Sequence, residues 1–140
     1  EDKLVTGVQT CALPIYLGGA TMAVLWGSAL LSAAVDNIPY VAAMNPLIVD
    51  LARSLHPEIT DYVALVHQPD IIPLWWALAL GACLGGNGTI IGASANVVIV
   101  DIARKAGYHI SFWQFFKFGF PVMIGSVLMC SVYLWFLFLR

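Results

Sequence analysis

The chain has 140 residues, of which 61% are hydrophobic and 10% are charged, and its mean hydropathy is +0.88. Soluble domains usually carry about a quarter charged residues, so this composition indicates an integral membrane chain. The net charge of −2 provides no basic patch for a nucleic acid. Cys11, Cys83 and Cys130 lack the spacing of a zinc site or a disulfide framework.

Residues 1–15 differ in character from everything that follows, because they mix charge, Thr, Gln and Pro without a sustained apolar period. They resemble a junction peptide that recurs in translated metagenomic assemblies, so we expect this segment to be non-native and take residues 16–140 as the protein domain. About 20 apolar residues cross a bilayer as a helix, and the chain could hold roughly four or five spans. We expect a C-terminal fragment of a longer membrane protein.

The first apolar run, residues 16–35, is rich in Gly, Ala and Ser and ends at Asp36, Asn37 and Pro39. Small residues allow close helix packing in membranes. Pro39 disfavours a continuing helix, while Asp36 or Asn37 can cap a new helix with proline in its first turn. The short turn predicts a re-entrant helical hairpin whose return limb covers residues 40–55. Residues 53–70 are polar and indicate an aqueous loop.

The second interruption lies between two apolar blocks, residues 71–84 and 90–102. Glycines stand at 85, 86, 88 and 92, and each lowers helix stability by about 1 kcal/mol relative to alanine. A straight helix is therefore not expected. The pattern predicts a discontinuous transmembrane helix that is broken between Gly85 and Asn96.

The C-terminal part predicts two further helices. Aromatic residues alternate with polar residues around Lys117, which is typical of a short interfacial helix, and residues 120–139 form a final transmembrane helix. Three cations and no acid between Arg104 and Lys117 place that segment on the cytoplasmic side.

Helix breaks at membrane depth expose backbone groups and helix ends, which is where secondary transporters bind ions and substrates. Oxygen ligands suit hard cations, so we expect a site built from Ser32, Asp36, Asn37, Asn87, Thr89, Ser94 and Asn96. Na⁺ could bind at Asp36, Asn37, Asn87 and Asn96. The competing interpretation is that these side chains only cap helix ends. Asp36 is the strongest candidate, because an ionisable group inside a membrane costs about 2.5 to 3.5 kcal/mol.

No catalytic motif of the hydrolase, kinase, metalloprotease or dinucleotide-binding classes is present in the sequence. We therefore expect no enzymatic activity and no cofactor other than Na⁺ or H⁺ as a coupling ion.

Two stretches, SAAVDNIPYVAAMNPLI and GACLGGNGTIIGASANVVIVDIARKAGYHISFWQFFKFGFPVM, resemble the C-terminal repeat of the ion transporter superfamily. The resemblance is strongest to its arsenite permease and P protein (pink-eyed dilution) branch, which is similar to the citrate transporters. It implies a carrier of two inverted repeats, each with a re-entrant hairpin and a broken helix, and it implies frequent homodimers. It places the site at Asp36, Asn37 and Pro39 in the hairpin tip, and in the break at Asn87, Gly88, Thr89, Gly92, Ser94 and Asn96.

From these observations we expect an all-α polytopic membrane protein, the C-terminal half of a Na⁺- or H⁺-coupled secondary carrier of an inorganic ion such as arsenite. It would sit as a multi-pass protein in the lipid bilayer of a prokaryotic inner membrane, with the missing N-terminal repeat and a second copy as partners. A dicarboxylate (citrate or succinate) Na⁺ symporter is the alternative. Dicarboxylate carriers have Ser-Asn-Thr at the tip, where this chain has Asp36, Asn37 and Ile38. A structural or channel-forming module is the alternative from another class.

Overall fold

The computed structural model describes the backbone of residues 2–138 and the side chains of residues 17–138. All regular structure in this part of the chain is helical, which confirms the all-α prediction. The order is α1 (Asp2–Ser32), α2 (Asn37–Leu55), α3 (Tyr62–Val66), α4 (Ile72–Gly85), a single 3₁₀ turn (Gly86–Gly88), α5 (Ser94–Lys105) and α6 (Phe112–Phe138). The non-native origin of residues 1–15 stays a prediction; residues 1 and 139–140 lie outside the described part.

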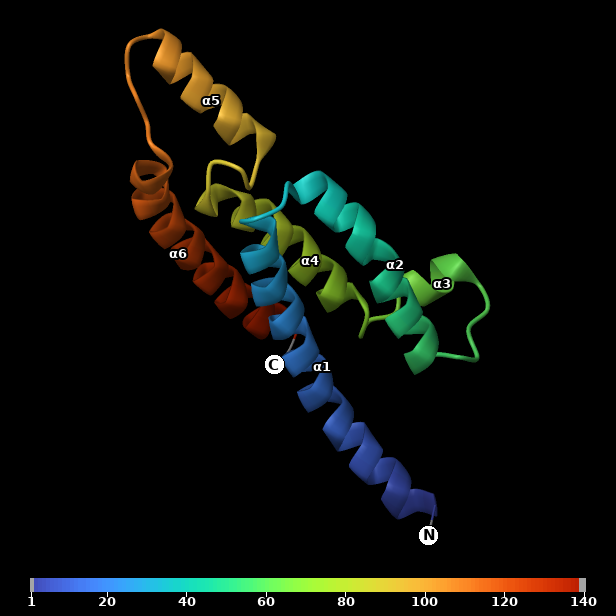
Figure 1. Cartoon of the computed structure of the whole chain (residues 1–140). Coiled ribbons are helices and arrows are strands. Elements are labelled where there is room, and N and C mark those ends of the chain that lie inside the picture. The colour runs from blue at the N-terminus through green and yellow to red at the C-terminus, as the bar shows by residue number, and fades with distance from the viewer. Residues whose placement is uncertain (1, 139–140) are drawn as a thin grey trace.

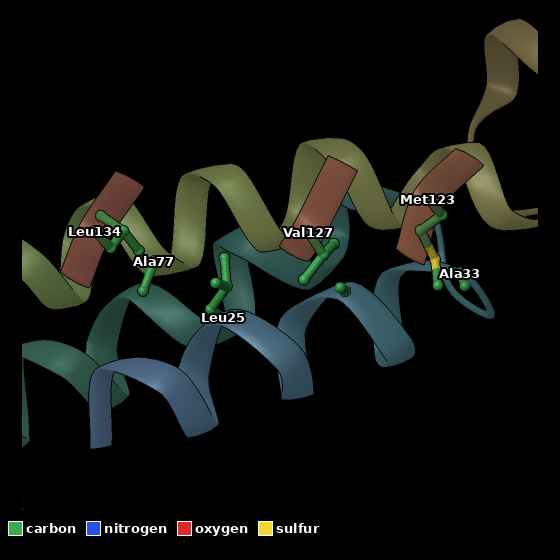
Figure 2. Close-up of a cluster of buried hydrophobic side chains, with 7 residues drawn as sticks. Leu25, Ala33, Ala77, Met123, Val127 and Leu134 are labelled. Atoms are coloured by element: carbon green, nitrogen blue, oxygen red, sulfur yellow. The ribbon is translucent and has the colours of Figure 1, made fainter. Parts of the chain in front are cut away.

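Helices α1, α4 and α6 form the centre of the molecule, with α1 and α4 running in the same direction and α6 running against both (Figure 1). Their shared core contains Leu25, Ala77 and Val127, each fully buried. Figure 2 shows Met123 of α6 beside Ala33 of α1, and Leu134 beside Ala77. In both of these pairs a large side chain faces a small one, which lets the helices interdigitate.

The contact between α1 and α4 depends on glycine. A Cβ at Gly81 would collide with the carbonyl oxygen of Leu25, and a Cβ at Gly85 would collide with the carbonyl oxygen of Ala29. Glycines spaced four residues apart remove one helix face and let two backbones touch, which is the usual way that helices associate in lipid. The G-x-x-x-G spacing of Gly81 and Gly85 is the sequence signal for this contact, which was not predicted.

Helix α2 folds back after a short turn at residues 33–36 and packs on α4 (Figure 1). The tyrosine hydroxyl of Tyr40 donates to Ser28 Oγ of α1 at 3.1 Å. The return limb begins at Asn37, three residues before the predicted start. The hairpin itself is therefore present, while its re-entrant placement in a membrane stays a prediction.

The polar loop contains a short helix that was not predicted. Asp61 caps α3 by accepting the amide N–H of Ala64 at 2.9 Å, and Leu65 is buried against Ile48 and Ala52 of α2. Burial of one leucine and a good N-cap outweigh the poor stability of so short a helix.

An ion pair joins the end of α2 to the approach to α4. His56 Nε2 lies 2.8 Å from Asp70 Oδ2, and His56 Nδ1 lies 3.4 Å from Glu58 Oε1. The hydrogen bond with Asp70 raises the pKa of the His56 imidazole above its usual 6.5, and the charges of Asp70 and Glu58 add to this effect while partial burial opposes it. Only a polar, aqueous loop was expected here, so the pair is a second feature that the sequence did not reveal.

The predicted interfacial helix is not a separate element. Residues 112–117 are the first turns of α6, which continues through Pro121 to Phe138. Phe112, Phe116 and Phe120 stack along one face at the i, i+4 spacing, with centroids 6.2 and 4.8 Å apart, and this stripe stabilises the first turns of the helix, before the proline. Helix α6 is the one described helix long and apolar enough to cross a membrane.

A capping box starts α6. The amide N–H of Gln114 donates to Ser111 Oγ at 3.3 Å, while the amide N–H of Ser111 donates to Gln114 Oε1 at 2.9 Å. Two N–H groups without helical partners are satisfied by this reciprocal arrangement. The S-x-x-Q spacing fixes the start of α6 at Phe112.

Candidate functional site

The first chain break is a compact turn closed by its own neighbours. Ala33 and Val35 still donate back into α1, to Ala29 O at 3.1 Å and to Leu31 O at 2.9 Å. Asp36 then caps α2, since its carboxylate accepts the amide N–H of Ile38 at a long 3.4 Å. Capping was one of the roles predicted for Asp36, and its half-buried carboxylate keeps lone pairs for another partner.

The second break is longer and is closed by a side chain. After α4 ends, the chain makes the 3₁₀ turn and then an irregular connection through residues 89–93 before α5 begins. The Asn96 amide donates to Gly86 O at 2.8 Å and to Thr89 O at 2.9 Å. Because both partners are carbonyl oxygens, the donor must be Nδ2. Asn96 thus ties the loop to the first turn of α5. The predicted break between α4 and α5 is present, while its placement in a transmembrane span stays a prediction.

The two breaks touch each other, although they lie 56 residues apart at the point of contact. The buried Thr89 hydroxyl donates to Ala33 O at the end of α1 and accepts the amide N–H of Gly92 at 3.0 Å. A Cβ at Gly92 would lie 2.9 Å from Ser32 O, so only glycine allows this approach. Nearby, the Ser32 hydroxyl donates to Ala82 O at 2.6 Å.

Helix α6 covers the same junction from another side. A Cβ at Gly88 would lie 2.7 Å from Met123 Sδ, and a Cβ at Gly119 would lie 2.5 Å from Asn87 O. The loop is therefore held between α1 and α6, with glycine at both contacts. This leaves the Asn87 side chain exposed, while the Asn87 backbone is fixed.

The predicted site residues divide into two groups. Thr89 and Asn96 make hydrogen bonds within the protein, while Gly88 and Gly92 are buried where backbones approach closely. Among the described contacts, no hydrogen bond joins the side chains of Asn37, Asn87 or Ser94 to another protein group. Pro39 is exposed in the first turn of α2 and has no polar side chain to bind a ligand.

Four helix ends converge at this junction, because α1 and α4 end there and α2 and α5 begin there. Asp36 caps the N-terminus of α2, whereas Ala93 provides no side-chain cap for α5. Uncapped amide groups and the helix dipole favour an anion at the start of α5, and carbonyl oxygens at the ends of α1 and α4 favour a cation. Within residues 33–36 and 86–93, Asp36 is the one ionisable residue.

Coordination of a cation here would depend on amide and backbone oxygens. Among the residues that the structure describes, no three His, Cys, Asp or Glu side chains lie together to hold a metal ion. Asp36, Asn37 and Asn87 are the candidate side-chain ligands at the two breaks, and Asn96 could add only its Oδ1. Oxygen ligands of this type suit Na⁺ better than a transition metal.

Known proteins similar to this chain are membrane proteins and transporters. A P protein of Sus scrofa is 49% identical over 118 residues, which are 84% of this chain and 13% of that protein. A 46 kDa membrane protein of Mycobacterium leprae is 47% identical over 108 residues, or 77% of this chain and 23% of that protein. An uncharacterized transporter of Mycobacterium tuberculosis is 47% identical over 112 residues, or 80% of this chain and 24% of that protein.

The chain thus spans about an eighth to a quarter of the length of these relatives. No family model and no solved structure matches it. The composition, the apolar helix α6 and the relatives together indicate an integral membrane chain. By the identity of this segment, the chain belongs with the P protein branch of the ion transporter superfamily.

Proposed function

We propose that this chain forms half of the binding site of a secondary active carrier that moves a small inorganic ion across a membrane. The observation that carries the proposal is the contact between the two breaks through Thr89 and Ala33, which brings four helix ends to one place. Paired interruptions of this kind line the substrate and ion sites of secondary transporters. Relatives that are named transporters support the same role.

The proposed site uses the polar groups that are still available at the junction. Asp36 would hold Na⁺ or a coupling proton, because it is the ionisable residue of the two breaks. Asn37 and Asn87 would contact the cargo through their carboxamides, and the uncapped start of α5 at Ser94 would favour an anionic cargo such as an arsenic oxyanion.

The rest of the carrier is part of the same proposal. An N-terminal repeat of the same protein would complete the site and cover α5, which buries none of its own residues. A homodimer in the inner membrane of a prokaryotic cell is the proposed assembly and location. No enzymatic step is part of the proposal.

The test is transport by the longest protein that contains this chain, reconstituted in proteoliposomes with imposed Na⁺ or H⁺ gradients. Arsenite is the first cargo, and citrate and succinate are the competitors. Asp36→Asn should abolish gradient-driven uptake with the protein still folded. The control Asp50→Asn removes an exposed carboxylate on α2 that is paired with Arg53 at 3.3 Å, and should leave uptake unchanged.

Other outcomes of this test would indicate a different function. Competition by millimolar succinate or citrate, with no arsenite flux, would identify a dicarboxylate symporter. Flux that needs no gradient would indicate a channel-forming module. No flux with any cargo, together with an unaffected fold of the Asp36→Asn variant, would indicate a structural module. Either result would contradict the proposal.

A further inference from the structure

Two of the predicted ligands have no hydrogen-bond donor to offer to a cargo. A threonine hydroxyl has one O–H, and that of Thr89 is donated to Ala33 O. An asparagine carboxamide has two N–H groups, and those of Asn96 are donated to Gly86 O and Thr89 O. Neither side chain can donate to an anion without first releasing a backbone carbonyl.

Releasing those carbonyls is costly at this place in the fold. Thr89 is 8% exposed, and Gly86 and Ala33 are buried, so water cannot readily replace the lost donors. A buried carbonyl left without a partner is strongly unfavourable, and more so where the surroundings are apolar. The bonds are therefore expected to persist in the presence and in the absence of cargo.

These bonds join one pair of segments that are distant in the chain and one pair that are adjacent. Thr89 connects the second break to the end of α1, and Asn96 connects the same break to the first turn of α5. Glycine at position 92 permits the approach, and the Gly92 amide completes it by donating to Thr89 Oγ1 at 3.0 Å. The two breaks are thus fastened into one unit by side chains rather than by packing alone.

We propose that Thr89 and Asn96 are positioning residues that act before any cargo binds, and that contact with the cargo belongs to Asn37 and Asn87. Thr89 holds the second break against the first, and Asn96 fixes the shape of the second break. Only the assignment of cargo contact to Asn37 and Asn87 rests on the proposed carrier function. The fastening of the two breaks is a property of the empty protein, and it can be measured without transport.

The first experiment is amide hydrogen exchange, followed by mass spectrometry, on the longest protein that contains this chain, in detergent and without cargo. Thr89→Val removes the hydroxyl at nearly constant volume and should speed exchange of residues 86–93 by about tenfold. Exchange of the turn 33–36 should rise less, because its amides are bonded locally to α1. Thr89→Ser keeps the hydroxyl and should restore protection. The control is Thr21→Val, because Thr21 is also buried but its hydroxyl bonds only to Leu17 O of its own helix at 2.8 Å.

A second variant keeps the inference testable if Thr89→Val does not fold. Asn96→Asp has nearly the same shape but, when ionised, no donor, so residues 86–90 should exchange faster. The control Asn45→Asp makes the same change at an exposed position of α2. The positioning role would be wrong if, without cargo, amide exchange in Thr89→Val and Asn96→Asp matched that of wild type and differed from it only after cargo was added.

Transport separates this inference from the proposed function. Asn87→Ala should raise the KM for cargo while leaving exchange of the empty protein unchanged, because the Asn87 side chain is exposed. If no cargo is transported but Thr89→Val still speeds exchange, the carrier proposal is wrong and the positioning role holds. If Asn87→Ala transports with an unchanged KM, the assignment of cargo contact to Asn87 is wrong.

Discussion

The two chain breaks look alike in the sequence, because each is a polar interruption of an apolar run, but they are stabilised differently. The first, at residues 33–36, is closed by short-range bonds to α1 and by the cap at Asp36. The second, at residues 86–93, is closed by Thr89, by Asn96 and by glycine contacts with α1 and α6.

This difference means that the first break is a property of its own sequence, whereas the second is a property of the assembled helices. A local cap survives the loss of distant contacts, since its partners are a few residues away. A loop held by contacts across the fold loses its shape when any of the surrounding helices moves. Perturbing the packing should therefore affect the second break first.

The largest effect is expected from Gly85→Ala, at the end of α4 just before the second break. The new Cβ would collide with the backbone of Ala29, so α1 and α4 must separate. We expect a loss of about 3 kcal/mol, measured as thermal unfolding of the longest protein in detergent. Gly27→Ala is the control, because nothing lies within 4 Å of a Cβ there; a similar loss in both variants would contradict the packing argument.

A smaller loss, about 2 kcal/mol, is expected from Gly92→Ala. The added methyl group would lie 2.9 Å from Gly86 O and Ser32 O, and backbone atoms cannot move aside cheaply. Gly88→Ala should cost less, since its closest neighbour is the flexible end of Met123 at 2.7 Å. Equal unfolding temperatures for the two variants would show that the second break is looser than the structure indicates.

The first break is tested by Asp36→Ala, which removes one helix cap and should cost about 1 kcal/mol in unfolding. Asp61→Ala removes the cap of α3 and should cost a similar amount. The two variants should differ in transport, because only Asp36 lies at the junction of the breaks. Transport retained in Asp36→Ala would assign that carboxylate to capping alone.

The smallest effect is expected from the pair of His56 and Asp70, which lies away from both breaks. Since folding raises the pKa of His56, its contribution is complete below about pH 6.5 and is lost as pH rises through the folded pKa. The contribution should be on the order of 0.5 kcal/mol. His56→Gln should remove this pH dependence from the unfolding temperature, while uptake at fixed pH should stay unchanged.

Much of the helical layout could be predicted from local sequence. The turn at Asp36 and Pro39, the break among the glycines after Leu84, and the apolar C-terminal helix were all predicted from residue types and spacing. These features depend on caps, proline geometry and glycine propensity, which act over a few residues. Boundaries were less accurate at α3, where the burial of Leu65 against α2 decides, and at the start of α6, where the local S-x-x-Q capping box was not recognised.

The sequence by itself determined that this is an apolar, all-helical chain with two interruptions, and that Asp36 is the one ionisable residue within residues 33–36 and 86–93. Only the tertiary structure decided that the interruptions meet, that Thr89 bonds to Ala33, and that Asn96 is already bonded to two carbonyls. The physical reason is that a hydroxyl or carboxamide has few hydrogen-bonding groups. Whether these groups bind a ligand or the backbone depends on which distant atoms the packed helices bring within reach.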